Sequence, residues 1–164
     1  MLYLLDASVL ITASRLYYPL ERVPEFWDWL VHQGETGNVK MPLEMIEEIR
    51  DGSDNLAEWM SDHHRLEALS LGEDADVGLV RRVIDEGYAP DLNDVEIEKI
   101  GRDPFLIAAA LHNSSERLVV TAEVSRPKAQ RANRKVPDVC DDLGVRWIDS
   151  FGLIHALDFS TGWR

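Results

Sequence analysis

Residues 103–121 read Asp-Pro-Phe-Leu-Ile-Ala-Ala-Ala-Leu-His-Asn-Ser-Ser-Glu-Arg-Leu-Val-Val-Thr. Asp103 followed by Pro104 is typical of a helix start, because the acid can cap the helix and proline fits its first turn. The run from Phe105 to Leu111 is apolar on all sides, which predicts a buried helix. Leu118 to Thr121 is a short apolar run typical of a central strand. A buried helix that leads into a buried strand indicates part of an α/β fold.

The same alternation continues on both sides of this stretch. Short apolar runs at 2–5, 39–41 and 145–148 predict further strands. Apolar residues at helical spacing, with proline, glycine and cap residues at the ends, predict helices between them. These helices are expected at 7–17, 24–33, 42–52, 54–63, 74–86, 91–99 and after Ser150. Short apolar strands alternating with helices predict a mainly parallel sheet that is covered on both faces.

Composition narrows the class of protein. The length of 164 residues and the absence of a repeat or linker predict a single domain over 1–164, and 45% apolar residues suffice for a core. Cys140 is the only cysteine, so no internal disulfide can form and a reducing compartment is expected. We find no signal peptide or membrane span, so we expect a cytoplasmic protein without a membrane partner. The net charge of −13 argues against tight non-specific binding to nucleic acid.

Four acids stand where apolar runs end or helices begin: Asp6, Glu48, Asp103 and Glu123. Asp6 and Glu123 follow predicted strands, and ligands of open α/β sheets bind at the carboxyl ends of strands. Carboxylates about 5 Å apart repel by on the order of 3 kcal/mol per pair at an effective dielectric near 20. A divalent cation relieves that repulsion, and an oxygen-only ligand set is typical of Mg²⁺ or Mn²⁺. The pattern therefore predicts metal-assisted cleavage of a phosphodiester.

Each acid also has a purely structural interpretation. Asp6 and Asp103 can simply cap the helices that follow them, at a gain of roughly 1 kcal/mol each. Glu48 lies beside Glu44 and Glu47, which suggests an acidic solvent-facing side, and Glu123 can be an ordinary loop acid. Only the joint placement of all four favours a metal site.

A basic segment follows Glu123 directly. It contains Arg126, Lys128, Arg131, Arg134 and Lys135, with no acid among them. Its position predicts a loop at the edge that carries the acids, where the cations can hold RNA phosphates. The alternative is a mobile polar loop that is basic by chance.

The order of these features resembles the PIN domain superfamily, including the VapC-type toxin ribonucleases and related prokaryotic PIN-like proteins. The resemblance covers nearly the whole chain and implies a three-layer α/β/α sandwich. It implies a Mg²⁺- or Mn²⁺-dependent endoribonuclease whose metal ligands are Asp6, Glu48, Asp103 and Glu123. Glu47 is the register alternative to Glu48, and Ser8 and Thr121 are expected beside the ligands. The implied partners are RNA, a small DNA-binding antitoxin and a second copy of the chain.

Two other functions remain open at this point. One is an aspartyl phosphotransferase or phosphatase with Asp6 as nucleophile. Haloacid-dehalogenase-type phosphatases carry a second aspartate two residues later, where this chain has Ser8. The other is a PIN-like binding module whose catalytic site has decayed, against which the presence of all four acids argues.

Overall fold

The computed structural model describes residues 1–164 and contains one four-stranded sheet, in the order β2-β1-β3-β4. The strands are β1 (Leu2–Leu5), β2 (Val39–Lys40), β3 (Arg117–Val120) and β4 (Trp147–Ile148). All three neighbouring pairs are parallel, with Leu5 opposite Val120 at the end of the central pair. The predicted parallel sheet is confirmed. Because the strands are parallel, their carboxyl ends share one edge of the sheet.

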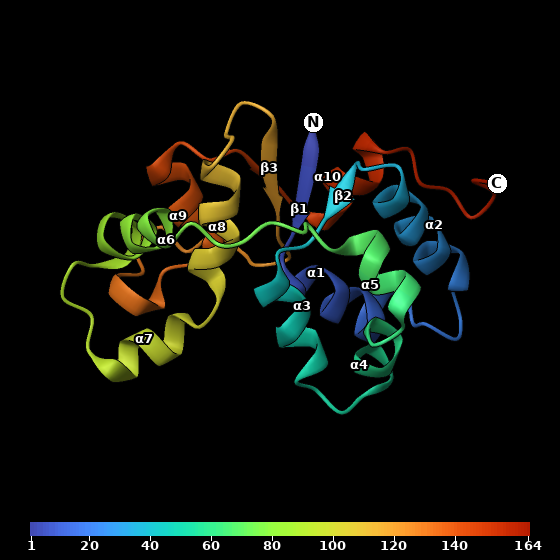
Figure 1. Cartoon of the computed structure of the whole chain (residues 1–164), viewed down its shortest axis with the longest axis horizontal. Helices are drawn as coiled ribbons and strands as arrows, with labels where there is room; N and C mark the ends of the chain where they lie inside the picture. Colours follow the sequence, from blue (N-terminus) through green and yellow to red (C-terminus); the bar gives the residue numbers. More distant parts are fainter.

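Ten α-helices surround the sheet. They are α1 (Ala7–Thr12), α2 (Pro24–Glu35), α3 (Leu43–Arg50), α4 (Asn55–Met60), α5 (His63–Leu69), α6 (Val77–Arg82), α7 (Asp94–Ile100), α8 (Asp103–Leu111), α9 (Val136–Leu143) and α10 (Ser150–Ala156). Figure 1 shows the strands between two groups of helices. One group contains α6 to α9, and the other contains α1, α2, α4, α5 and α10. The molecule is therefore a three-layer α/β/α sandwich.

The core explains why the central strands are apolar throughout. Leu4, Leu5, Val119 and Val120 are completely buried, since helices cover both faces of β1 and β3. On one face α8 packs against these two strands. On the other face Phe26, Trp27 and Trp29 of α2 form an aromatic cluster with Tyr18 and Phe159.

Several predicted helices are shorter or divided. The helix expected over 54–63 ends at Met60 as α4, and Asp62 accepts a hydrogen bond from the backbone of Arg65 and caps a separate helix, α5, that was not predicted. The helix expected over 7–17 changes to π geometry after Thr12, as segment η1 (Ala13–Tyr17). The helix expected from residue 74 begins at Val77, because Asp76 caps α6, and it continues as the π segment η2 (Val83–Tyr88). The strand expected over 145–148 is only Trp147–Ile148.

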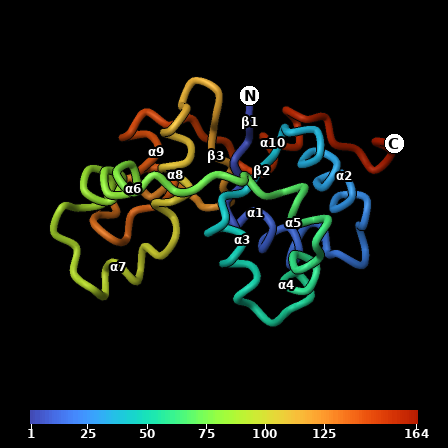
Figure 2. The backbone as a smooth tube through the Cα atoms, viewed as in Figure 1, coloured from blue at the N-terminus to red at the C-terminus, as the bar shows by residue number.

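The two ends of the chain lie apart. Figure 2 shows the N-terminus at the start of β1 and the C-terminus beside α2. Trp163 donates from its indole nitrogen to the carbonyl of Glu25, and Arg164 pairs with Asp28 at 2.8 Å, so the last residues lie along α2. None of the helices combines the length and the apolar character that a membrane crossing needs.

Candidate functional site

Asp6 lies at the end of β1, where its carboxylate is held by two hydroxyl groups. Ser8 Oγ and Thr121 Oγ1 each donate to Asp6 Oδ2 at 2.7 Å, and the Ser8 amide donates to Oδ1 at 3.3 Å. The last of these bonds makes Asp6 the cap of α1, as the structural interpretation expected. Asp6 is only 4% exposed, so these donors replace the water that a buried carboxylate needs.

The same two hydroxyls connect Asp6 to the segment that follows β3. Ser8 Oγ accepts from the backbone of Ala122, and Thr121 Oγ1 accepts from the backbone of Glu123, each at 3.1 Å. Each hydroxyl thus donates to the carboxylate and accepts from the backbone. This network fixes the backbone of Glu123 relative to Asp6.

Glu123 is half-buried and directed at the start of α9. Its Oε2 accepts from the amide of Val136 at 2.8 Å, and its Oε1 lies 4.0 Å from Lys135 Nζ. The carboxylate therefore also satisfies one free amide at a helix N-terminus.

The other two acids predicted as metal ligands, Asp103 and Glu48, lie on two helices. Asp103 is the first residue of α8, with Arg102 in the cap position, so the predicted capping role of Asp103 is wrong. Glu48 lies on α3, and the charges of Asp6 and Glu123 act on it, which favours Glu48 over the register alternative Glu47. We call Asp6, Glu48, Asp103 and Glu123 the carboxylate cluster.

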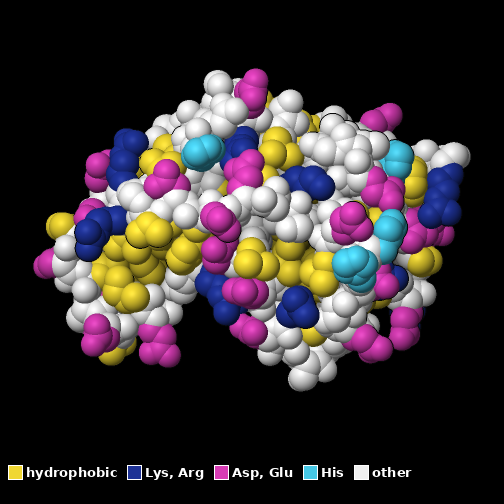
Figure 3. Space-filling model, viewed as in Figure 1, with side chains coloured by type: hydrophobic (Ala, Val, Ile, Leu, Met, Phe, Trp, Pro, Cys, Tyr) yellow, Lys and Arg dark blue, Asp and Glu magenta, His cyan; other side chains and the backbone are white.

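Three members of the carboxylate cluster line an open cleft. Glu48, Asp103 and Glu123 share it with residues 99–102, and its volume is about 390 Å³. Figure 3 shows the molecule hollowed at its lower edge, between the part that carries α7 and the part that carries α3 and α4. The cleft thus lies at the carboxyl edge of the sheet, where ligands of α/β proteins bind.

Burial and mutual repulsion raise the proton affinity of this cluster. The pKa of Asp103 is raised to about 8, first by burial and then by the charges of Asp6, Glu123 and Glu48. Burial is also the main cause that raises the pKa values of Glu48 and Glu123, and the charge of Asp6 adds to both. The four acids are therefore electrostatic neighbours. In the arrangement seen, however, no three His, Cys, Asp or Glu side chains are placed to hold a metal ion.

The basic segment is a loop, with the short 3₁₀ segment η3 (Arg131–Asn133), but its cations have different roles. Arg131 pairs with Glu96 at 2.8 Å and Asp91 at 2.7 Å, and Arg134 pairs with Asp142 at 2.6 Å. Lys135 is near Glu123. Arg126 and Lys128 are exposed, and their side chains form no ion pair. Of the five predicted RNA-binding residues, these two are free to meet an external phosphate.

Sequence reasoning missed two polar residues near this edge. Asp138 is 6% exposed and accepts from the hydroxyl of Ser125 and the amide of Arg126, so it fixes the start of the basic loop. Tyr88 is 7% exposed and its hydroxyl forms no hydrogen bond. Asp138 had a usable signal, an acid directly after proline at a helix start, whereas Tyr88 ends a π segment that no pattern predicts.

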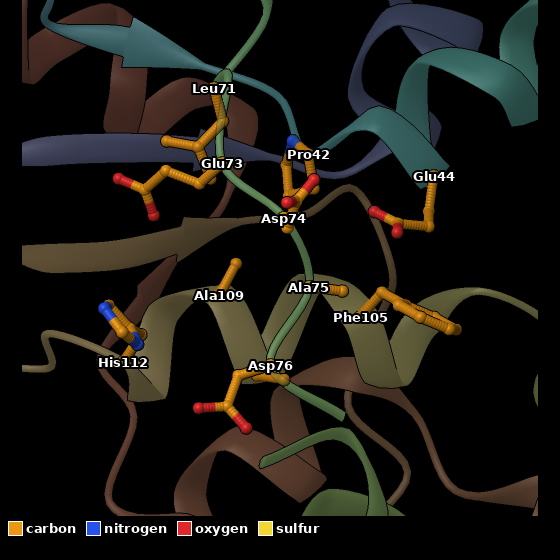
Figure 4. Close-up of a pocket in the computed structure, with 11 residues that line it drawn as sticks. Pro42, Glu44, Leu71, Glu73, Asp74, Ala75, Asp76, Phe105, Ala109 and His112 are labelled. Carbon is orange, nitrogen blue, oxygen red and sulfur yellow. The ribbon is translucent and has the colours of Figure 1, made fainter. Parts of the chain in front are cut away.

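A second cavity of about 170 Å³ lies between the segment 71–76, α8 and the start of α3. Figure 4 shows Glu73, Asp74 and Asp76 around it, with Phe105 and Ala109 of α8 beside them. Glu73 pairs with Arg117 at 2.6 Å and Asp76 caps α6. Two of its acids therefore have structural partners, and the cavity contains none of the carboxylate cluster.

The fold and the site together define the class of protein: an α/β sandwich with an acidic cleft at the carboxyl edge of a parallel sheet. The chain belongs to the family described as domain of unknown function DUF4411, whose model matches residues 3–161. Comparisons with curated proteins and with solved structures gave no significant match.

Proposed function

We propose that this protein is a Mg²⁺- or Mn²⁺-dependent endoribonuclease of the PIN-like type, and that it serves as the toxin of a toxin–antitoxin pair. The main support is the carboxylate cluster: Glu48, Asp103 and Glu123 come from distant parts of the chain and line one cleft, and the charge of Asp6 acts on all three. Mutual repulsion of this kind costs stability unless a cation or a proton relieves it.

The chemistry of the donors fits a hard divalent cation. All four members offer carboxylate oxygens, and neither histidine nor cysteine lines the cleft. Arg102 and Lys135 offset part of this charge, but burial and the neighbouring acids still raise the pKa values of Glu48, Asp103 and Glu123. The side chains need to turn toward a common point to act as ligands, because no three of them are placed for a metal ion as they stand.

The residues of the site then have separate roles. Asp6 and Asp103 would hold the cation, and Glu48 and Glu123 would hold it or its waters. A divalent cation in such a site lowers the pKa of a bound water and neutralises charge on the phosphate. Ser8 and Thr121 keep Asp6 in one orientation through their 2.7 Å hydrogen bonds. Arg126 and Lys128, on the loop beside Glu123, hold the phosphates of single-stranded RNA.

A cleavage assay tests the enzymatic part. Purified protein is incubated with mixed RNA and Mn²⁺, with and without EDTA, beside an Asp6→Asn/Asp103→Asn double variant. We expect cleavage by the wild type alone and only without EDTA. Glu48→Gln should lower the rate at least 100-fold, while Glu47→Gln, one position away on α3, should leave it within about two-fold. Equal cleavage by the double variant would refute the assignment of the site.

The toxin role needs its own test. Induced expression of the wild type should stop bacterial growth, and the double variant should not. Co-expression of the protein encoded next to the gene should restore growth. Normal growth of cells that express an active ribonuclease would reject the toxin role and leave the enzymatic proposal intact.

One observation favours the alternative of a catalytically silent binding module: no three acids stand in ligating positions. Absence of both RNA cleavage and Mn²⁺ binding would favour that alternative. The phosphotransferase reading has less support. Asp6 is 4% exposed and its Oδ2 already accepts from two hydroxyls, which leaves it a poorly accessible nucleophile.

A further inference from the structure

A pocket of about 280 Å³ adjoins the cleft that the carboxylate cluster lines. Asp103, Glu123 and Lys99 line both hollows, so the two share one wall. The basic segment supplies three further cations to the pocket: Arg126, Arg134 and Lys135. We call this hollow the basic pocket. Its four cations outnumber its two acids, so its local charge is positive although the chain carries a net charge of −13.

Two distant parts of the chain bring these cations together. Lys99 lies in the last turn of α7, which packs against η3 of the basic segment. Figure 1 shows this orange segment directly beside α7. The ammonium of Lys99 donates to the side-chain carbonyl of Asn133, and the amide of Arg126 donates to the buried carboxylate of Asp138 at 2.8 Å. Hydrogen bonds therefore hold both parts of the basic pocket, which lowers the cost of ordering them around a ligand.

Three of the four cations keep donors that the chain does not use. The guanidinium of Arg134 is occupied, because it donates to an acid and to two backbone carbonyls. Lys99 has three N–H donors and gives one of them to a neutral amide. The exposed side chain of Arg126 forms no ion pair, and Lys135 Nζ lies 4.0 Å from Glu123, beyond hydrogen-bond distance. These donors are available to an anion that enters the basic pocket.

A terminal phosphate group is the anion that fits this donor set. It carries a charge of about −1.5 to −2 at pH 7 and offers three strong acceptor oxygens. A carboxylate offers one charge and two oxygens, and it would leave one of the three cations unmatched. The pocket volume of about 280 Å³ lies just below the roughly 300–1,000 Å³ of sites for drug-sized ligands. The basic pocket therefore has room for a phosphate and a small attached group.

Acids elsewhere on the surface have little influence on binding at this pocket. At physiological ionic strength the charge of one group is screened over about 8 Å. A bound phosphate would therefore respond mainly to Lys99, Arg126 and Lys135. Asp103 and Glu123 of the shared wall remain close, and their oxygens can accept from hydroxyl groups beside the phosphate, such as those of a ribose.

We propose that the basic pocket binds a single terminal phosphate group, free or on a nucleotide, through Lys99, Arg126 and Lys135. The proposal gives a binding role to Lys99, which lies on α7 outside the basic segment. Lys128 does not line this pocket, so the site differs from the contacts proposed for an extended RNA strand. Binding here needs neither a metal ion nor RNA cleavage, so the site stands apart from the proposed ribonuclease activity.

NMR titrations of the full chain in EDTA test this site. The probes are uridine 5′-monophosphate, inorganic phosphate and uridine, each followed through the backbone amide signals of residues 125–136. We expect both phosphates to shift these signals and uridine to leave them unchanged. Lys99→Ala and Arg126→Ala should each raise the dissociation constant of uridine 5′-monophosphate about 10-fold, because each removes a charged hydrogen bond. Lys99→Arg keeps the charge and should recover most of the affinity.

Arg81→Ala is the matched control. Arg81 on α6 is exposed, forms no ion pair and does not line the basic pocket. Its substitution changes the net charge by the same amount and should leave the dissociation constant within about two-fold, because screening weakens its charge at a distance. Urea midpoints of all variants check that the fold is unchanged.

The outcomes separate this site from the proposed function. Wild-type affinity in Lys99→Ala or Arg126→Ala overturns the proposal, and so does an equal loss in Arg81→Ala. Uridine that binds as tightly as its monophosphate, or no binding of either phosphate, overturns it as well. Binding of only one phosphate probe supports the site and identifies the ligand as a nucleotide or as free phosphate. A protein that binds phosphate but cleaves no RNA loses the ribonuclease proposal and keeps this site, and RNA cleavage without phosphate binding does the reverse.

Discussion

Thr121 connects two members of the carboxylate cluster through a single hydroxyl group. It is completely buried, donates to Asp6 at 2.7 Å and accepts from the amide of Glu123 at 3.1 Å. The resemblance to PIN domains implied a hydroxyl residue at this place, but the two-way bonding follows only from the structure. A residue of this kind contributes to stability and to the orientation of Asp6 at once.

Thr121→Val keeps the shape and removes the hydroxyl. We expect the free energy of unfolding to fall by about 1–3 kcal/mol, because the substitution leaves a buried carboxylate and a buried amide each without one partner. Urea unfolding measures the change. Thr36→Val removes an exposed hydroxyl that donates to two helix carbonyls, and it should cost less than about 1 kcal/mol. Equal losses would show that the Thr121 network adds nothing.

The raised pKa of Asp103 predicts that the stability of the protein depends on pH. Its pKa is raised to about 8, so between its ordinary value near 4 and about 8 the folded chain holds a proton that the unfolded chain has lost. Stability should therefore fall as pH rises through this range, by on the order of 1 kcal/mol per unit at most. Asp103→Asn cannot ionise, so in EDTA it should flatten this slope and be more stable than the wild type at pH 8. Thermal melts at pH 5, 6, 7 and 8 measure both effects.

The π segment η2 is held in place by its packing against α9. Gly87→Ala would place a Cβ 2.6 Å from Val139 Cγ1 and 3.3 Å from Leu143 Cδ1, both on α9. We expect a loss of about 1–3 kcal/mol from overpacking. Gly78→Ala on α6 meets only the Asp76 carboxylate at 3.2 Å and should be neutral or stabilising. Chemical denaturation of both variants measures this difference. Helix propensity alone would not produce it, because both variants replace glycine by alanine.

The basic loop separates two kinds of cation that look alike in the sequence. Arg126→Ala and Lys128→Ala should each weaken binding of single-stranded RNA, because these exposed side chains have no ion pair in the protein. Arg131→Ala should instead lower the free energy of unfolding, because it releases Asp91 and Glu96 of the α7 region. Fluorescence anisotropy with RNA and urea unfolding distinguish the two effects. The opposite pattern would return Arg131 to the RNA-binding set.

The sequence predicted those elements whose signals are local. The strand 2–5 and the helix that begins at Pro24 follow from apolar runs and from the fixed φ of proline, so their positions agree closely with the structure. The helix α9 also has a proline in its first turn but was not predicted. The break between α4 and α5 depends on whether Asp62 caps a new helix, and tertiary packing decides that. The partners of Arg131 lie 35 and 40 positions away, so no local pattern indicates them. For the same reason the unpaired hydroxyl of Tyr88 was not foreseen.

At the scale of the whole molecule, the net charge of −13 opposes any polyanion. Figure 3 shows acidic side chains spread over the visible face, with lysine and arginine scattered among them. Under the proposed function, RNA binding would therefore depend on a few local contacts and on a cation bound in the cleft.

This distribution predicts a weak salt dependence of RNA binding. Two phosphate contacts, from Arg126 and Lys128, correspond to a slope of about −1.4 in log K against log[salt] for single strands. Titrations from 50 to 300 mM KCl at constant Mn²⁺ measure the slope, and Arg126→Ala should reduce its size by about 0.7. A slope steeper than about −4 would require a phosphate-binding surface that this structure does not contain.

Both outer strands of the sheet, β2 and β4, are only two residues long. The chain continues past β2 at Met41, whose amide donates to Leu69 and whose carbonyl accepts from Leu71. The backbone at this edge of the sheet is therefore already paired. A strand from another molecule finds too little unpaired backbone there for cross-β growth. Concentrated preparations should therefore resist fibril formation, even under conditions that screen the repulsion between these acidic molecules.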